Sequence, residues 1–481
     1  MLWLAVDFPA LALEVFPGAA HGAGAFAVAT RRDRGEVLIA NRAAVRAGVA
    51  PGMPVSAACA LAPGLLVQPR NAAAERRALE GVAIWAGQFT PQLSLSPSRA
   101  VLLAEIGGGL KLFGGLEAML ARVRAGLAEL GYEALLACAP VPGAAGLLAH
   151  AGFELVLETH AQLAPHLSRL PLACLDAAPE ILAGLEALGL RTLGECLALP
   201  ADGLARRFGP ALPAQLRRVL GEAPDPQPPF TPPERYAAGL ELPAPAETVD
   251  GIIFGLRRLL GELAGLLATR NLGATEIAIE LGHERHPATR IALKLSVPSR
   301  DARHLLELAR ERLARVDLCG RVTGFGLTLE SSMQLAPRLF SLFGGSENSF
   351  ESRAQLIERL RARLGETAVC GLQLIPDHRP ELAFREAGPD AEAAAKSLRC
   401  GASRAPRPLW LVQPPRPLAL RNGAPWLAGR LKLDAGPESI ASGWWDGNDV
   451  RRDYFAARTV HGERVWIYRE ASGWFLHGLF A

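Results

Sequence analysis

The stretch WLAVDFPALALEVF, residues 3–16, decides the fold expected at the start of this chain. Trp3 to Val6 is a short apolar run bounded by turn-forming residues, which predicts a buried β-strand. The strand ends on one acid, Asp7, and Pro9 then interrupts the pattern. An acid at the end of a core strand is a common position for a metal ligand, but two-metal chemistry on phosphates needs several carboxylates together. Asp7 is therefore either part of a working metal site or the remnant of a lost one.

Length and composition limit the class of protein. At 481 residues the chain is expected to form roughly three to five compact units. We find no run that could span a bilayer and no signal peptide, which predicts a cytoplasmic protein without a membrane partner. The seven cysteines are scattered and never form a CxxC pair, which argues against a disulfide framework or a zinc site.

The net charge of +3 is too small to indicate a nucleic-acid partner by itself. The bases are almost all arginine, and the only lysines are Lys111, Lys294, Lys396 and Lys432. Arginine suits phosphate binding, although an Ala- and Arg-rich chain can equally reflect coding bias.

Strand-like and helical patterns divide the chain into six segments with a multidomain α/β and α+β character. Residues 1–165 alternate strands and Ala/Leu-rich helices, with helices expected at 72–88 and 116–130. Residues 166–222 are helical, and residues 223–236 form a Pro-rich linker. Residues 237–333 follow a β-α-β-β-α-β order. Residues 334–403 are a linker with a helical segment. Residues 404–481 form a β-rich domain that holds most of the tryptophans, and a Pro-rich stretch from about Arg404 to Pro417 precedes its strands.

The helical segment contains GLEALGLRTLGECLALP, residues 184–200, in which Gly189 interrupts two helical patterns. Thr192 and Glu195 predict a capping box at the start of the second helix. Two short helices joined by a glycine hairpin can grip a nucleic-acid backbone through exposed amides. A plain corner between two helices explains the same pattern, and the sequence leaves both open.

Several stretches together resemble the Y-family translesion DNA polymerases, and in particular their ImuB-type branch, a mutasome subunit. ANRAAVRAGVAPGM (residues 40–53) resembles the fingers, and LAEIGGGLKLFGG (103–115) resembles the palm. The hairpin resembles the thumb, and the β-α-β-β-α-β unit resembles the little finger. GWWDGNDVRRDYF (443–455) and GWFLHGLFA (473–481) are similar to the tail of the ImuB-type branch.

The resemblance implies that the metal site is degenerate. Working members hold two cations about 4 Å apart with three carboxylates, one ending the first strand and an adjacent Asp-Glu pair in the palm. Asp7 stands at the first position, but the pair falls at Ala100 and Val101, which cannot bind a metal. Glu105 is the other acid that remains. The resemblance also places the family's triphosphate-gripping Tyr and Arg of the fingers at Arg42 and Val45. We therefore expect no catalytic residues, no metal and no cofactor. Asp7 is expected to be a strand-end acid that accepts backbone hydrogen bonds. Mg²⁺ would be required only if the protein were an active polymerase.

Phosphate binding depends on arginine side chains and amides, and neither needs a metal. Expected contacts to damaged or primer-template DNA are Gly189, Arg191, Gly194, Arg206, Arg207, Arg217 and Arg218 in the thumb, and Arg285, Arg290 and Lys294 in the little finger. Each base taken alone can equally be a solvated surface charge.

After the little finger comes QLAPRLFSLFGG, residues 334–345. Its segment Leu339, Phe340, Ser341, Leu342 and Phe343 is similar to peptides that dock into the apolar groove of the β sliding clamp, although it carries Leu where Gln is expected. The alternative is a linker that tucks its aromatic rings onto the little finger.

Together these features predict an inactive adaptor in SOS-type mutagenic translesion synthesis, associated with the nucleoid. The resemblance implies three protein partners: the clamp, an error-prone DnaE-type polymerase and a RecA-like, ImuA-type protein. Expected partner-binding residues in the tail are Trp444, Trp445, Trp466, Trp474 and Phe475. The rivals are an active polymerase using Asp7, Glu105 and a third acid, and a protein that only binds DNA structures.

Overall fold

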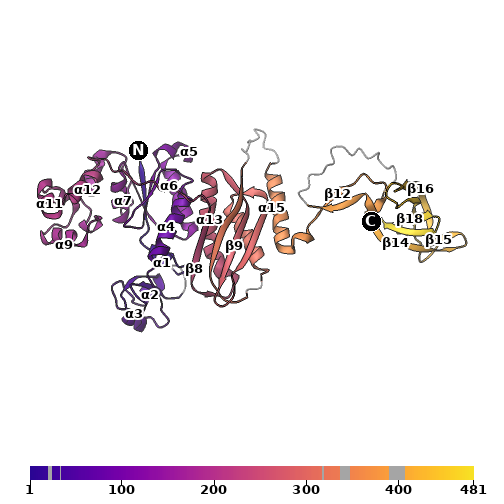
Figure 1. The fold of residues 1–481 in the computed structure, drawn as a ribbon, viewed down its shortest axis with the longest axis horizontal. Helices are drawn as coiled ribbons and strands as arrows, with labels where there is room; N and C mark the ends of the chain where they lie inside the picture. The colour runs from indigo at the N-terminus through magenta and orange to yellow at the C-terminus, as the bar shows by residue number, and fades with distance from the viewer. Residues whose placement is uncertain (20–23, 33, 317–318, 336–346, 389–406, 481) are drawn as a thin grey trace. The chain divides into compact units, whose positions relative to one another are not determined.

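The computed structural model of the protein describes residues 1–19, 24–32, 34–316, 319–335, 347–388 and 407–480 (Figure 1). These residues form two compact units, Met1–Arg363 and Leu364–Ala481. Among the described residues, no helix combines the length and the apolar character needed to cross a membrane.

The palm of the first unit is a four-stranded antiparallel sheet in the order β5-β6-β1-β7. Its strands are β1 (Trp3–Asp7), β5 (Leu93–Leu95), β6 (Val101–Glu105) and β7 (Leu135–Ala139). Side chains alternate across the sheet, so Leu4 and Val6 pack against α4 (Ala72–Ala86) and α6 (Leu116–Leu130). Ala5 faces the other way, toward α7 (Pro142–His150). The central strand is therefore buried on both faces.

Short elements complete the palm. They are α1 (Leu11–Glu14), the 3₁₀ turns η1 (Gly107–Gly109) and η2 (His160–Gln162), and α5 (Leu110–Phe113).

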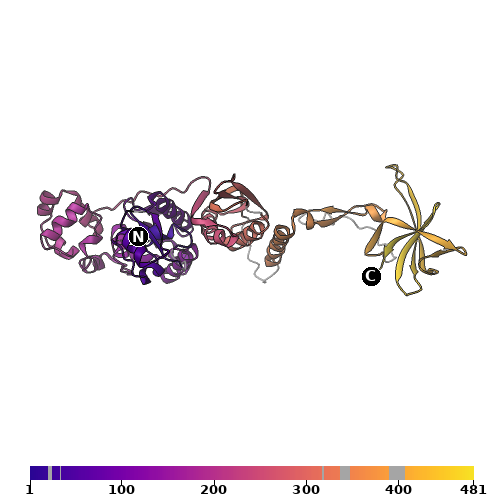
Figure 2. The same cartoon turned by 90° about the horizontal axis from the view of Figure 1, so that it is seen from below.

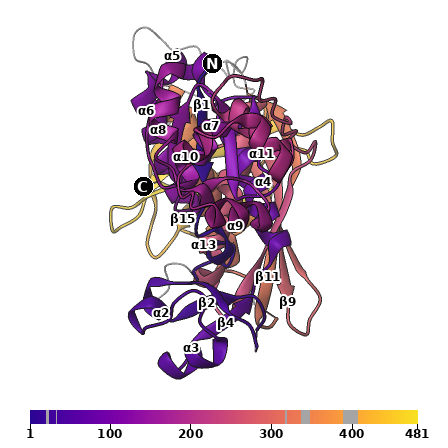
Figure 3. The same ribbon diagram turned by 90° about the vertical axis from the view of Figure 1, so that its left-hand side faces the viewer.

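The fingers are a small separate layer, seen below the palm elements in Figures 1 and 3. A three-stranded sheet in the order β3-β2-β4 is covered by two short helices. The elements are β2 (Phe26–Ala29), β3 (Val37–Ala40), α2 (Arg42–Arg46), α3 (Val55–Leu61) and β4 (Leu66–Pro69). Asn41 caps α2 through its side chain and also accepts a hydrogen bond from the Phe26 amide, which joins the helix to the sheet.

The thumb is helical and packs on the α7 face of the palm. Its elements are α8 (Leu163–Leu167), η3 (Leu172–Cys174), α9 (Pro179–Ala187), α10 (Leu193–Leu197), α11 (Ala201–Phe208) and α12 (Ala211–Val219). The capping box of Thr192 and Glu195 is confirmed, and Gly189 adopts a positive φ of 81°, which favours glycine.

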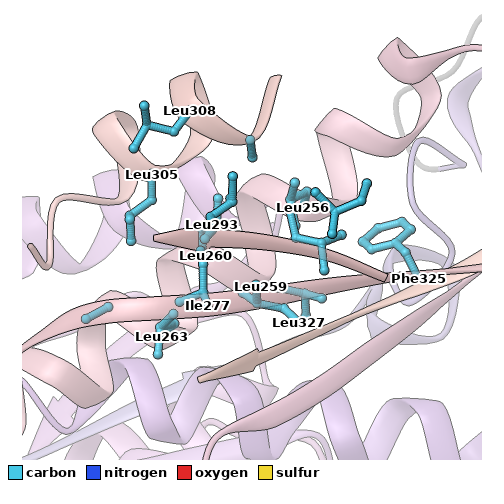
Figure 4. Close-up of a cluster of buried hydrophobic side chains, with 14 of the residues drawn as sticks. Leu256, Leu259, Leu260, Leu263, Ile277, Leu293, Leu305, Leu308, Phe325 and Leu327 are labelled. Atoms are coloured by element: carbon cyan, nitrogen blue, oxygen red, sulfur yellow. The ribbon is translucent and has the colours of Figure 1, made fainter. Parts of the chain in front are cut away.

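The little finger has the expected β-α-β-β-α-β order, with an antiparallel sheet ordered β10-β9-β11-β8. Its elements are β8 (Ala237–Ala246), α13 (Val249–Thr269), β9 (Leu272–His283), β10 (Thr289–Ser299), α14 (Ala302–Leu313) and β11 (Val322–Gln334). Leucines of α13 and α14 meet the inward side chains of the strands, as Figure 4 shows for Leu260, Leu305 and Leu293. One face of the sheet is covered in this way. A further helix, α15 (Glu347–Leu364), contributes Ala362 to the same core.

The second unit is β-rich. A six-stranded antiparallel sheet has the order β15-β14-β19-β18-β17-β16, and Figure 2 shows its strands fanning out in a strong twist. Its strands are β14 (Trp410–Arg421), β15 (Ala424–Trp426), β16 (Lys432–Ser442), β17 (Val450–Arg458), β18 (Arg464–Glu470) and β19 (Gly473–Leu479). The turn η4 (Glu366–Ala368) and a hairpin of β12 (Gly371–Leu374) and β13 (Phe384–Ala387), with the turn η5 (Pro380–Leu382) between its strands, precede the sheet.

One expectation about the tail needs correction. The Pro-rich stretch was expected to run to Pro417 before the strands begin, but β14 already starts at Trp410 and includes Pro414 and Pro417. The β14–β19 register shifts between Leu411 and Arg416, and β15 pairs only with the last residues of β14. The prolines are tolerated because the β14–β19 hydrogen-bond ladder is interrupted at Pro414, and β15 does not pair with β14 at Pro417.

Candidate functional site

The palm site is centred on Asp7, at the end of β1. Because side chains alternate along a strand, Asp7 shares the face of Ala5 and points toward α7. Its carboxylate is buried, and Oδ1 lies 3.0 Å from Nδ1 of His150, at the end of α7. The partner is therefore a histidine side chain rather than the backbone amides that the sequence suggested.

The strand positions beside Asp7 carry no other acid. In the register of the sheet, Asp7 lies opposite Val101 on β6 and Leu135 on β7. Ala100 comes just before β6, and its carbonyl oxygen accepts a hydrogen bond from the amide of Phe8. Neither Ala100 nor Val101 has a side-chain atom that can bind a cation.

Glu105 lies at the far end of the same strand pair. It is opposite Trp3, four residues along β1 from Asp7, or about 13 Å. Its Oε1 accepts hydrogen bonds from the amides of Leu2 at 3.2 Å and Gly107 at 3.1 Å. The register thus separates Asp7 and Glu105 too far for one metal ion to bridge them.

The donor set of the palm does not fit a pair of divalent cations. Within the described ranges, no group of three or more His, Cys, Asp or Glu side chains is arranged to hold a metal ion. Asp7 and His150 supply one carboxylate and one imidazole, whereas two magnesium ions require several oxygen ligands. We derive no metal-dependent step from this site.

Next to the missing acids, the chain ties the palm to the thumb, a feature that the sequence did not reveal. Arg99 donates hydrogen bonds of 2.7 Å to the carbonyl oxygens of both Cys174 and Leu175. Ser98 donates to Asp176 in the same loop. This segment is a structural connection between the palm and the thumb.

The fingers positions expected to hold a triphosphate are also occupied differently. Arg42 is paired with Glu133 of the palm at 3.1 Å and is largely exposed. Val45 is more than half exposed and has no polar atom in its side chain. Val45 therefore cannot bind a phosphate, and Arg42 already has an acid as its partner.

The hairpin amides of the thumb already have acceptors within the protein. Glu195 Oε2 accepts from the amides of Arg191 at 2.6 Å and Thr192 at 3.0 Å, and these bonds lower the pKa of Glu195. The amides of Leu193 and Gly194 donate to the carbonyl oxygens of Leu170 and Ser168. A phosphate could reach the hairpin amides only by displacing Glu195.

The thumb side chains are more accessible than its amides. Arg191, Arg206, Arg207 and Arg217 are exposed, and they come from the hairpin and from the ends of α11 and α12. Arg218 is partly buried and lies 3.7 Å from Asp225. The exposed arginines are the residues here that can meet a phosphate without losing a protein partner of opposite charge.

The outward face of the little-finger sheet has little free positive charge. Arg290 and Lys294 share this face, as alternation predicts, but each lies directly opposite a glutamate of β9. Arg290 forms an ion pair of 2.6 Å with Glu330, and Lys294 lies 4.0 Å from Glu276. Four acids occupy outward positions on this face: Glu241, Glu276, Glu280 and Glu330. Arg285, in the β9–β10 turn, is exposed.

The tail tryptophans separate into exposed and buried residues. Trp444 and Trp445, in the β16–β17 loop, are 77% and 57% exposed. Trp466 lies in the core and stacks on Tyr454 with ring centroids 4.1 Å apart, so any effect on a partner would be indirect. Trp474 and Phe475 are half-buried on β19.

The clamp-like segment, residues 339–343, lies outside the described residues.

An arginine cluster fixes the loop that carries the exposed tryptophans. Arg379 donates to Asp446 Oδ2 at 2.6 Å and to the carbonyl oxygen of Asn448 at 3.3 Å, and it also binds Asp377. Its guanidinium lies 5.8 Å from the ring of Trp445, and its hydrogen bond lowers the pKa of Asp446. The sequence offers no signal for this cluster because Arg379 lies 67 and 69 residues from its partners in the tryptophan loop, Asp446 and Asn448.

A second missed cluster joins the little finger to the palm. Arg258 of α13 is only 3% exposed and donates to the carbonyl oxygens of Glu14, Leu130 and Gly131. Its guanidinium also stacks over Tyr132 at 4.2 Å. The available signal was a charged pair, Arg258 and Glu262, spaced i,i+4 among the leucines of a largely apolar helix.

Comparisons with known proteins agree with this architecture. The impB/mucB/samB family matches residues 23–150, and the C-terminal domain of that family matches residues 238–337. The DNA polymerase IV of Yersinia pseudotuberculosis is 30% identical over 202 residues, covering 40% of this chain and 54% of that protein.

Among solved structures, a Y-family DNA polymerase chimera of Dbh and Dpo4 has 18% identity and a TM-score of 0.39, covering 70% of this chain and all of that one. DinB from Sulfolobus solfataricus has 19% identity and a TM-score of 0.37, covering 68% and 98%. The protein ImuB of Caulobacter vibrioides is 30% identical over 468 residues, which is 90% of this chain and the full length of that protein. The chain therefore belongs to the ImuB family, with the palm, fingers, thumb and little finger of a Y-family polymerase followed by a β-rich domain.

Proposed function

We propose that this protein is a catalytically inactive, polymerase-like adaptor in damage-induced mutagenic translesion synthesis, acting at the nucleoid in the cytoplasm. The observation that carries the proposal is the palm: Asp7 is paired with His150, and Val101 stands opposite it. A two-metal phosphoryl transfer requires several carboxylates around the reacting oxygens, and this palm offers one. The architecture of a polymerase is retained while its metal ligands are not.

A primer-extension assay tests this inactivity. The full chain, with Mg²⁺ or Mn²⁺, is expected to add no nucleotide above the background of a matched Asp7→Ala preparation. A contaminating polymerase would give equal extension in both preparations. Extension by the wild type that disappears in Asp7→Ala would instead establish an active polymerase.

DNA binding in this proposal rests mainly on the thumb arginines. Arg206 and Arg207 are exposed at the end of α11, where they can approach phosphates. The outward little-finger face is a weaker candidate because Arg290 and Lys294 are each placed beside glutamates. The exposed Arg285 remains available in the neighbouring turn.

Clamp binding through residues 339–343 is the second part of the proposal, on the strength of the sequence pattern alone. A Phe343→Ala variant should lose retention on immobilised β clamp, because an aromatic anchor dominates such short peptides. Met333→Ala, an exposed position at the end of β11, serves as the matched control. Unchanged retention of Phe343→Ala would remove the motif from the proposal.

The third part assigns capture of the DnaE-type and RecA-like partners to the tail. Trp444 and Trp445 support this because they are exposed on a loop that Arg379 anchors, so little ordering is needed on docking. A Trp444→Ala, Trp445→Ala variant should lose partner capture while its thermal unfolding stays unchanged. Capture equal to that of the wild type would place the docking surface elsewhere.

A further inference from the structure

A cavity of about 470 Å³ lies inside the first unit where the palm, the linker and the little finger meet. Helix α4 forms one wall, linker residues 230–236 form another, and β8 with α13 closes the rest. Its volume lies in the range of small-molecule sites. None of the residues assigned above to DNA, clamp or partner binding lines it.

The cavity walls are largely aromatic and aliphatic. Residues from three parts of the chain contribute: Phe16, Ile84, Tyr132, Phe230, Leu240 and Leu259. Such a surface favours a flat, apolar body over a chain of polar groups.

One buried carboxylate stands out in this lining. Glu262 is 4% exposed, and its Oε2 lies 3.1 Å from the hydroxyl of Tyr236, whose one proton it shares with the carbonyl oxygen of Leu259 at 2.8 Å. In the described part of the chain no hydrogen bond reaches Oε1. Desolvation raises the pKa of Glu262 to about 7. A buried carboxylate with an open oxygen in a cavity is costly unless something donates to it.

A glycine of α4 makes room for this carboxylate. A Cβ atom at Gly81 of α4 would lie only 2.5–2.6 Å from the carboxylate atoms of Glu262. An alanine at this position would displace the carboxylate or cover it.

The charges around the cavity determine whether it favours a positively or a negatively charged ligand. Glu80 and Glu241 line it together with Glu262, against a single lining arginine, Arg77. The charge of nearby Arg258 lowers the pKa of Glu262, but burial raises it further, and Nε, Nη1 and Nη2 of Arg258 each already donate to a carbonyl oxygen of the palm. An anion such as a phosphate is therefore disfavoured here, and a cation is favoured.

We propose that this cavity is a binding site for a small aromatic cation, whose ring packs on the apolar walls and whose cationic head donates to Glu262. The site is independent of the adaptor function. Because three parts of the chain line it, a bound cation stabilises their assembled arrangement by mass action.

Benzamidine is the probe that tests the site, since it combines a flat ring with a donor-rich cation. Calorimetric titration of the full chain at pH 8, where Glu262 is ionised, should show saturable binding. Benzoate, which has a similar shape and the opposite charge, should bind at least about tenfold more weakly. Absence of saturable benzamidine binding, or equal affinity for benzoate, would overturn the proposal.

Variants then locate the bound probe. Glu262→Gln and Gly81→Ala should each weaken benzamidine by about tenfold or more, the first by removing the charge and the second by covering it. Glu117→Gln, at an exposed side chain of α6 that does not line the cavity, controls for bulk charge and should keep affinity within about threefold. Unchanged binding in Glu262→Gln would disprove the site. If Glu262→Gln does not fold, the affinity of Gly81→Ala for benzamidine and the comparison with benzoate test the site instead.

Discussion

Replacing Arg258 by methionine tests how firmly the little finger is joined to the palm. Methionine keeps much of the volume of the buried stem but removes the guanidinium. The bonds to Glu14 and Leu130, at 2.7 and 2.9 Å, are well formed, and the bond to Gly131, at 3.4 Å, is weak. Two charged hydrogen bonds contribute about 1.5–3 kcal/mol each, and the stacking on Tyr132 adds about 1–2 kcal/mol.

The net cost is smaller than the sum, because removing a buried charge also removes its desolvation penalty. We expect a loss of about 3–5 kcal/mol in the free energy of opening this junction. Since about 1.4 kcal/mol corresponds to tenfold, amide exchange at the junction should accelerate by roughly a hundred- to three-thousandfold. Hydrogen exchange followed by mass spectrometry on peptides covering residues 127–133 measures this directly.

Arg257→Met is the matched control. Arg257 neighbours Arg258, is exposed, and its replacement removes the same charge. It should leave exchange in residues 127–133 within about threefold of the wild type. Equal protection in the two variants would show that the buried guanidinium does not hold the junction together.

Three further predictions concern charge, DNA and the tail. Because the pKa of Glu262 rises from 4.5 to about 7 on folding, the folded state binds more protons between these values, so the free energy of unfolding should fall by about 3 kcal/mol as pH rises from 5 to 8. In Glu262→Gln this fall should disappear from denaturant unfolding measured at the same pH values. Arg206→Ala should reduce the slope of log affinity for DNA against log salt by about 1, while Arg76→Ala, at a side chain paired within α4, should not. Trp466→Ala should cost about 3–5 kcal/mol in denaturant unfolding followed by near-UV circular dichroism, because this buried ring stacks on another; Trp444→Ala should change stability by less than about 0.5 kcal/mol.

Locally determined features could be predicted from the sequence. The helix expected at residues 116–130 from its Ala- and Leu-rich pattern has those ends in the structure, where Gly115 and Gly131 flank it with positive φ. The capping box at Thr192 and the strands of the little finger follow from equally short-range patterns. These signals need only a few neighbouring residues, so tertiary context did not override them.

Contacts between distant residues could not be predicted in this way. Arg258 donates hydrogen bonds to carbonyl oxygens that are 127 to 244 residues away in sequence, and no neighbouring residue in the sequence indicates these acceptors. Gly261 and Gly265 gave a partial signal, because Cβ atoms there would collide with Leu130 and with the backbone of Trp85. Small residues at i,i+4 on an apolar helix indicate close packing of another helix, but not which helix packs there.

The palm site shows the same division between local and distant information. The sequence indicated that Ala100 and Val101 replace acids, but the partner of the remaining acid Asp7 is His150, which lies 143 residues away along the chain.

That pairing changes how the degenerate site should be understood. Val101 is 3% exposed and packs in the same core as Ala5 and Leu103, so a carboxylate restored there would be buried beside Asp7. Two carboxylates in such a position repel each other and favour protonation unless a cation is bound. The present palm instead holds one acid with one imidazole and fills the adjoining position with a methyl-bearing side chain. This arrangement places no second carboxylate beside Asp7, as expected for the inactive adaptor proposed above.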